Sequence, residues 1–157
     1  MSGGDLMDAK VYAVTDERQL SMRDLLDYFS KRGAMRVSDL HLKVRCPPVY
    51  RVDGDLQKMK GTPLDRPTIE TLVRSVLTES EWTTLQDSGS VDSSYITETM
   101  QFRINCFSDN DGLAMAVRAL AKTIPAVEDI GFPNNVWRDV IVQQQGLVLL
   151  TGITGAG

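Results

Sequence analysis

Two arginines, Arg103 and Arg118, lie on adjacent predicted strands that a short turn joins. A guanidinium group is a planar fork of five N–H donors that matches the oxygens of a phosphate. The two side chains could therefore bind a phosphorylated ligand together. A pair of solvated or salt-bridged surface arginines is the ordinary alternative, and the residues alone leave both interpretations open.

The last residues of the sequence form a second candidate phosphate site, in which Gly152 and Gly157 have the glycine spacing of a P-loop. In that motif a strand is followed by G-x-x-x-x-G-K-[ST] and a helix, and the loop N–H groups cradle phosphate oxygens. The apolar run 147–150 is the predicted strand. An ordinary glycine-rich turn is the alternative. The candidate nucleotide-binding residues here are Gly152, Ile153, Thr154, Gly155, Ala156 and Gly157.

A third polar group is Asp39 with His41, which alternate with apolar residues in a predicted strand. Alternation places both side chains on one face of the strand. Because no nucleophile accompanies them, structural hydrogen bonding is favoured over acid–base catalysis, and we assign no catalytic residue. Two cysteines and a single histidine form no metal motif, so we expect no metal ligands in this chain.

The elements that must position these residues indicate an α+β fold, in which helices flank an antiparallel sheet. Apolar residues at helical spacing and capping residues predict helices from Ser21 to Gly33, from about Pro67 to Leu77, from Thr78 to Gly89 and over 134–143. Alternating apolar residues and turn signals predict strands over 37–44, 49–52, 56–59, 91–97, 100–108, 113–121 and 147–150.

Composition and order divide the chain into a flexible lead-in (1–20), an N-terminal domain (21–121), a linker (122–133) and the start of a second domain (134–157). The net charge is −4 and the basic residues are scattered, which argues against nucleic acid as the main partner. No apolar run reaches the roughly 20 residues of a membrane helix, and the N-terminus lacks the plan of a signal peptide. We therefore expect a cytoplasmic location.

Four stretches of the sequence, taken in order, resemble the PilT family of type IV pilus retraction (twitching-motility) ATPases, within the secretion-type hexameric ATPases. The resemblance covers roughly residue 21 to the end, and the loop 45–46 departs from the family's pattern. Ile153 and Ala156 replace the commoner Pro and Ser of its phosphate loop. The stretches are 37–42 with 47–54, 102–107 with Gly112 and Arg118, 124–125 with 130–133, and 146–152 running into the loop.

This resemblance implies a PAS-like N-terminal domain, a linker and the first strand of a RecA-like ATPase domain that stops within the Walker A loop. It implies a cytoplasmic homo-hexamer that uses ATP and Mg²⁺ to pull on the pilus base, with inner-membrane platform proteins as partners. In that family two N-terminal arginines reach the bound nucleotide, and they match Arg103 and Arg118. The Phe-Arg-x-Asn context makes the match of Arg103 the firmer one.

The resemblance also sets an expectation for this chain alone. The lysine and the Ser or Thr of the P-loop do not follow Gly157 in the sequence, and neither does a Walker B carboxylate. We expect no ATPase activity and negligible nucleotide affinity from the chain without its parent, and hence no cofactor. Two other functions remain open: a related type II or type IV secretion motor ATPase, and a free-standing PAS-like sensor or interaction module.

Overall fold

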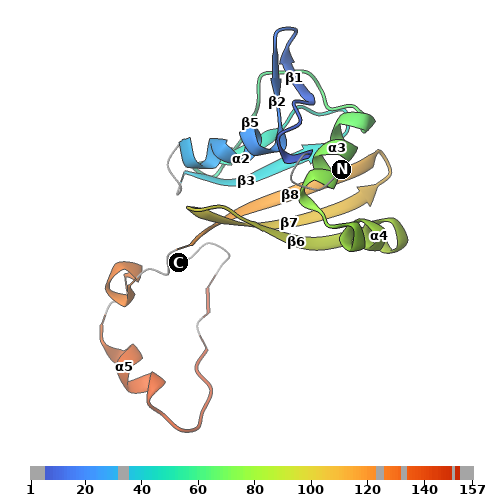
Figure 1. Cartoon of the computed structure of the whole chain (residues 1–157). Coiled ribbons are helices and arrows are strands. Elements are labelled where there is room, and N and C mark those ends of the chain that lie inside the picture. The colour runs from blue at the N-terminus through green and yellow to red at the C-terminus, as the bar shows by residue number, and fades with distance from the viewer. Residues whose placement is uncertain (1–5, 32–35, 123–125, 132–133, 150, 153–157) are drawn as a thin grey trace. The chain divides into compact units, whose positions relative to one another are not determined.

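A computed structural model describes residues 6–31, 36–122, 126–131, 134–149 and 151–152. The chain divides into two compact units, Met1–Lys122 and Thr123–Gly157. The first unit is a mixed α+β fold in which helices accompany antiparallel sheets (Figure 1). This agrees with the predicted fold class.

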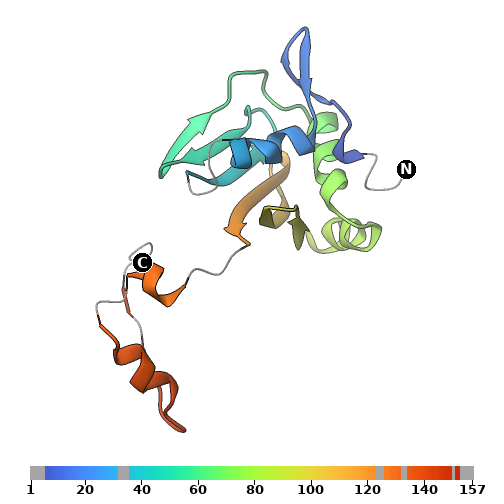
Figure 2. The ribbon, with the colours of Figure 1, turned by 60° about the vertical axis from the view of Figure 1, so that its left-hand side comes forward.

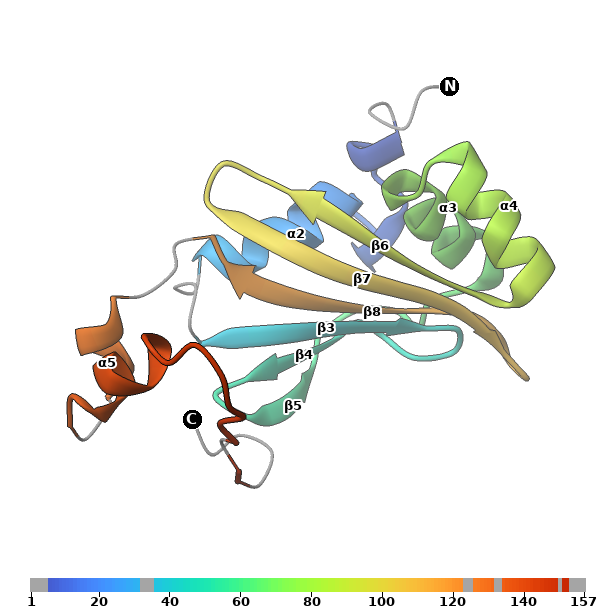
Figure 3. The same ribbon diagram turned by 90° about the horizontal axis from the view of Figure 1, so that it is seen from below.

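The centre of the first unit is a six-stranded sheet with the strand order β5-β4-β3-β8-β7-β6, in which each neighbouring pair is antiparallel. Two groups of strands, each connected by hairpins, meet where β3 pairs with β8, as the view from below shows (Figure 3). The strands are β3 (Val37–Lys43), β4 (Val49–Val52), β5 (Asp55–Lys58), β6 (Ser90–Ile96), β7 (Met100–Asp109) and β8 (Gly112–Ala121).

Three helices accompany this sheet, namely α2 (Met22–Lys31), α3 (Arg66–Val76) and α4 (Glu79–Ser88). Their apolar faces pack with one face of the sheet in a single core, in which the rings of Phe29 and Phe102 lie 5.2 Å apart, edge to face. In the described part of Met1–Lys122 no helix covers the other face of the sheet (Figure 3). That second face carries the candidate site.

The ends of α4 form as the sequence predicts. Thr78 accepts a hydrogen bond from the backbone N–H of Glu81, and the Glu81 carboxylate accepts one from the backbone N–H of Thr78. This reciprocal capping box satisfies two backbone donors that the first helical turn leaves unpaired. Gly89 ends the helix at a φ of 80°, a left-handed conformation that glycine adopts without steric cost.

The N-terminal residues depart from the expectation of a flexible lead-in over 1–20. Residues 12–20 form an antiparallel hairpin of β1 (Tyr12–Thr15) and β2 (Arg18–Leu20). The side chains of Tyr12 and Leu20 are buried in the same core as the helices. The burial of these apolar side chains in the core holds the segment in place. The polar composition of the segment does not indicate this burial.

The second unit contains a 3-10 turn, Val127–Ile130, and the short helix α5, Val136–Ile141 (Figures 1 and 2). The strand predicted over 147–150 does not form at 147–149, where the side chains are exposed, and Leu150 lies outside the described residues. A strand requires a partner for its backbone hydrogen bonds. The described part of this unit holds no other strand to supply one.

Among the described residues, no helix has both the length and the apolar character that a membrane span requires.

Candidate functional site: an arginine-lined hollow on the open sheet face

A row of charged side chains crosses the open face of the sheet. The register pairs Arg103 with Arg118, Arg118 with Asp39, and Asp39 with Arg51. Directly opposed residues on neighbouring strands share a face. The row therefore runs from β7 through β8 and β3 to β4 and brings together residues that are up to 79 positions apart.

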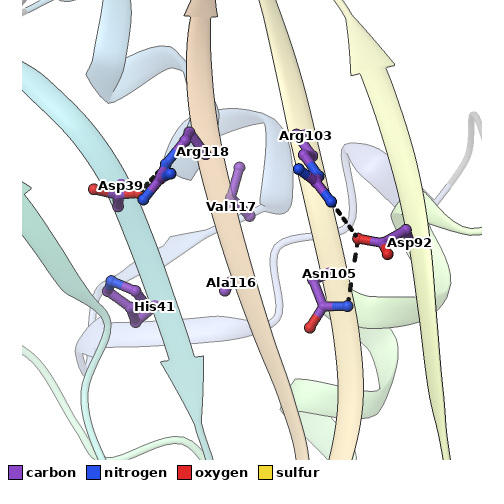
Figure 4. A pocket seen from close by; sticks show the side chains of 8 residues that line it. All are labelled: Asp39, His41, Asp92, Arg103, Asn105, Ala116, Val117 and Arg118. Atoms are coloured by element: carbon purple, nitrogen blue, oxygen red, sulfur yellow. Dashed lines mark hydrogen bonds and ion pairs between the residues drawn. The ribbon is translucent and has the colours of Figure 1, made fainter. Parts of the chain in front are cut away.

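A second row lies beside the first, where Asp92 opposes Asn105, Asn105 opposes Ala116 and Ala116 opposes His41. The two rows enclose a hollow of about 320 Å³. Figure 4 shows the charged and polar side chains around it, drawn from β3, β6, β7 and β8. The lining residues are Asp39, His41, Asp92, Arg103, Asn105, Ala116, Val117 and Arg118.

The core fixes which side chains face this hollow. Leu40, Ile104 and Val117 alternate with the charged residues along the same strands and are buried against the helices. A slip of one residue in the register would move these apolar side chains into water and the charged ones into the core. The packing of the covered face thus determines the position of the charged groups on the open face.

Asp39 is the most buried of the charged side chains that form ion pairs in the site, and its side chain is only 8% exposed. The Nε–H of Arg118 donates to its Oδ1 at 2.9 Å, and the Ser38 hydroxyl donates to its Oδ2 at 2.7 Å. Arg51 Nε lies 3.2 Å from the same Oδ2 as an ion pair. Burial raises the pKa of Asp39, but the bonds from Ser38 and Arg118 outweigh it and lower the pKa below its ordinary value.

Arg103 is held more loosely than Arg118. Its Nη2 lies 3.6 Å from Asp92 Oδ1, and Asn105 Nδ2 donates to the same oxygen at 3.4 Å. The side chains of Arg103 and Asp92 are 71% and 61% exposed, so water screens this pair. The two arginines therefore differ: one is anchored by a buried carboxylate and the other has an exposed, distant partner.

The charge arrangement favours an anionic ligand. Arg103 and Arg118 oppose each other directly, which is unfavourable for like charges on neighbouring strands. The row and its neighbour hold three guanidinium groups and two carboxylates, so positive charge is in excess. A phosphate between the two arginines would relieve the repulsion and accept hydrogen bonds from both forks.

The outer edge of Arg118 is available for such a ligand. Its side chain is 67% exposed although its Nε is bound to Asp39. Within the part of the chain that the structure describes, no residue accepts a hydrogen bond from its Nη atoms. One guanidinium can thus bind a carboxylate through one edge and a phosphate through another.

The structure brings together several residues that the sequence singled out. Arg103 and Arg118 are neighbours on one face, and Asp39 and His41 share the hollow with them. Asp39 has the structural hydrogen bonds that we favoured over catalysis. The roles of Arg51, Asp92 and Asn105 were not foreseen. Arg51 could have been found by counting back from the Asp53-Gly54 turn, whereas Asp92 depends on the pairing of β6 with β7.

Of the glycine loop 152–157, the structure describes only the first residue. Gly152 is described and exposed, in a segment without regular secondary structure. The other candidate residues, Ile153, Thr154, Gly155, Ala156 and Gly157, lie outside the described residues. Among the described residues, no three His, Cys, Asp or Glu side chains lie close enough together to bind a metal ion.

The homologues of this chain are pilus-associated motor ATPases. It is 30% identical over 139 residues to the type IV pilus retraction ATPase PilT of Pseudomonas aeruginosa, covering 88% of this chain and 39% of that protein. It is 27% identical over 113 residues to the twitching motility protein of Neisseria gonorrhoeae, covering 71% of this chain and 30% of that protein. The chain thus spans well under half of the length of these relatives. No family model matches it.

Solved structures with the same fold come from the same group of ATPases. The crystal structure of the pilus retraction motor PilT with bound ADP matches with a TM-score of 0.61 and 30% identity, over 71% of this chain and 33% of that one. The ATPase DotB of Legionella pneumophila matches with a TM-score of 0.60 and 23% identity, over 85% and 37%. The described fold resembles the N-terminal domain of these ATPases.

Proposed function

We propose, from the premise that its homologues are twitching-motility ATPases, that this chain is the N-terminal part of an ATP-driven motor for type IV pilus retraction. The observation that carries the proposal is the opposed pair Arg103 and Arg118 on the open sheet face. In the parent protein these arginines contact the phosphates of bound ATP. Their positive charge stabilises the charge that develops on the γ-phosphate during hydrolysis.

The division of labour follows from the proposed architecture. The first unit is a PAS-like domain that supplies the arginines, and residues 134–157 begin a RecA-like ATPase domain. Gly152 to Gly157 are assigned to its phosphate loop by their glycine spacing.

The assembly that we propose is a cytoplasmic homo-hexamer. It acts at the inner membrane through platform proteins of the pilus base and uses ATP with Mg²⁺.

The test is ATP turnover by the full-length parent. Arg118→Ala should lower kcat about 100-fold, because one preorganised charge on the developing phosphate charge is lost. Arg103→Ala should act in the same direction. The matched control is Arg74→Ala, which removes a partly buried arginine on α3 that pairs with Glu70 and lies over the Trp82 ring, outside the hollow. Unchanged turnover in Arg118→Ala, with the control also unchanged, would remove the proposed role.

A related secretion motor is the second candidate, and the observation in its favour is the fold similarity to DotB over 85% of this chain. Both motors use the same nucleotide contacts, so turnover does not separate them. Deletion of the parent gene does: loss of twitching with intact secretion supports pilus retraction, and the reverse supports secretion.

A free-standing sensor would need a ligand cavity between the sheet and its helices. In this structure Phe29, Phe102 and Tyr50 fill that space, with ring centroids 5.2–5.8 Å apart. The packing therefore favours the motor over the sensor. ATP turnover by the full-length parent distinguishes the two directly.

A further inference from the structure

We propose that Asp39 is a positioning residue, which holds Arg118 by its Nε edge so that the Nη edge faces the phosphates of the nucleotide. This inference rests on the proposed function. It goes further by assigning to a buried carboxylate the orientation of an arginine 79 residues away along the chain. Asp39 does not touch the ligand and acts through Arg118.

The contacts of Asp39 carry the first step. Both carboxylate oxygens are occupied, Oδ1 by Arg118 Nε at 2.9 Å and Oδ2 by the Ser38 hydroxyl at 2.7 Å. A carboxylate that is fixed at both oxygens cannot rotate without losing a hydrogen bond. It therefore presents Oδ1 to Arg118 in one direction only.

Arg51 forms a second ion pair with the Asp39 carboxylate. Its Nε lies 3.2 Å from Asp39 Oδ2, and its Nη1 donates to the carbonyl oxygen of Gly54 at 2.9 Å. Arg51 is thus tied both to Asp39 and to the turn between β4 and β5. Arg51 thus places a second positive charge beside the Asp39 carboxylate.

The shape of the guanidinium group carries the second step. An arginine side chain has many rotamers, and ordering it at a ligand costs conformational entropy. Fixing Nε to Asp39 removes most of that freedom before the ligand arrives and leaves the Nη edge pointing away from the carboxylate. A lysine cannot do this, because its single ammonium group would be engaged by Asp39.

Arg103 lacks a comparable anchor, since Asp92 is exposed and 3.6 Å away. The loss of the Asp39 carboxylate should therefore affect catalysis more than the loss of the Asp92 carboxylate. The two carboxylates line the same hollow, so this difference separates positioning from a general change of charge in the site.

The first experiment observes the arginine side chains of this chain by ¹⁵N NMR. We expect a slowly exchanging Nε–H for Arg118 that exchanges with water at least about tenfold faster in Asp39→Asn, since a charge-assisted bond is lost. Asp92→Asn should change it less, and Glu70→Gln, a carboxylate on α3 that pairs with Arg74, should leave it unchanged. A rapidly exchanging Arg118 Nε–H in the unsubstituted chain would overturn the proposal.

The second experiment is a double-mutant cycle on ATP turnover by the full-length parent. Asp39→Asn should lower kcat at least about tenfold with a smaller change in KM, because the arginine that it orients acts on the transition state. In the Arg118→Ala background, Asp39→Asn should have no further effect, since Asp39 acts through Arg118. A multiplicative loss in the double variant would overturn positioning and leave the proposed function intact.

Arg118→Lys is the second variant, in case Asp39→Asn impairs folding. It keeps the positive charge and the partner of Asp39 but lacks the second edge, so its kcat should fall nearly as far as that of Arg118→Ala. Turnover close to that of the unsubstituted protein would overturn the proposal. Unchanged turnover in Arg118→Ala itself would instead remove the proposed function, and the inference with it.

Discussion

The two faces of the six-stranded sheet are built from the same strands and do different work. On the covered face Phe102 is 1% exposed and packs against Phe29, whereas the next residue, Arg103, has a side chain that is 71% exposed on the open face. Val117 and Arg118 show the same contrast on β8. The alternation of a β-strand thus lets core packing and the proposed ligand contact reside in adjacent residues.

This separation has one exception, which is Asp39. It belongs to the open face by its position in the sheet, but its side chain is 8% exposed and hydrogen-bonded. A substitution there should therefore affect both the stability of the fold and the proposed nucleotide contact.

The largest effect should come from the covered face. Phe102→Ala should lower the free energy of unfolding by about 3–5 kcal/mol, because it removes a buried ring and leaves a cavity. Urea denaturation followed by circular dichroism measures this value. The matched control is the adjacent Arg103→Ala, which should stay within about 0.5 kcal/mol of the unsubstituted chain. Similar losses for both variants would break the comparison between the faces.

A smaller loss is expected at the exception. Asp39→Asn should lower the free energy of unfolding by about 1–3 kcal/mol at pH 7, since the hydrogen bonds to a buried charged group are weakened. Glu70→Gln makes the same chemical change on an exposed helix surface and should be nearly neutral. A neutral result for Asp39→Asn would place this residue with the exposed charges of the open face.

The difference in unfolding free energy between the unsubstituted chain and Asp39→Asn should depend on pH. The pKa of Asp39 is lowered in the folded state, so its contribution to stability is present above the unfolded value of about 3.9. It is lost as the pH falls through the lower folded value. The stability gap between the unsubstituted chain and Asp39→Asn should therefore narrow as the pH falls below about 4. A constant gap between pH 7 and pH 3 would contradict the assignment of this pKa.

The sequence predicted those parts of the fold that local chemistry determines. The Thr78 cap, the Gly89 stop and the Asp53-Gly54 turn follow from residue types at fixed offsets. The pairing of β3 with β8 joins segments that are far apart in sequence, so no local pattern indicates it. The N-terminal hairpin pairs residues that are close in sequence, but it was missed because the burial of Tyr12 depends on the rest of the core.

The same limit applies to the site. Arg103 and Arg118 were predicted to lie on adjacent strands because one short turn joins these strands, and the structure shows them directly opposed. Asp39 enters the site only through the long-range pairing of β3 with β8, and its anchoring of Arg118 could not be inferred from the sequence. The proximity of two side chains within one hairpin was thus predictable from the sequence, whereas a contact between side chains of two different hairpins was not.

The central claim is that the open face recognises the γ-phosphate of ATP through Arg118. The most direct measurement compares the affinity of the full-length parent for ADP and for a non-hydrolysable ATP analogue, in the unsubstituted protein and in Arg118→Ala. Our account predicts about tenfold weaker binding of the ATP analogue with ADP binding unchanged, because a single charged contact to the third phosphate is lost. Equal affinities in both proteins, or an equal loss for both nucleotides, would contradict it.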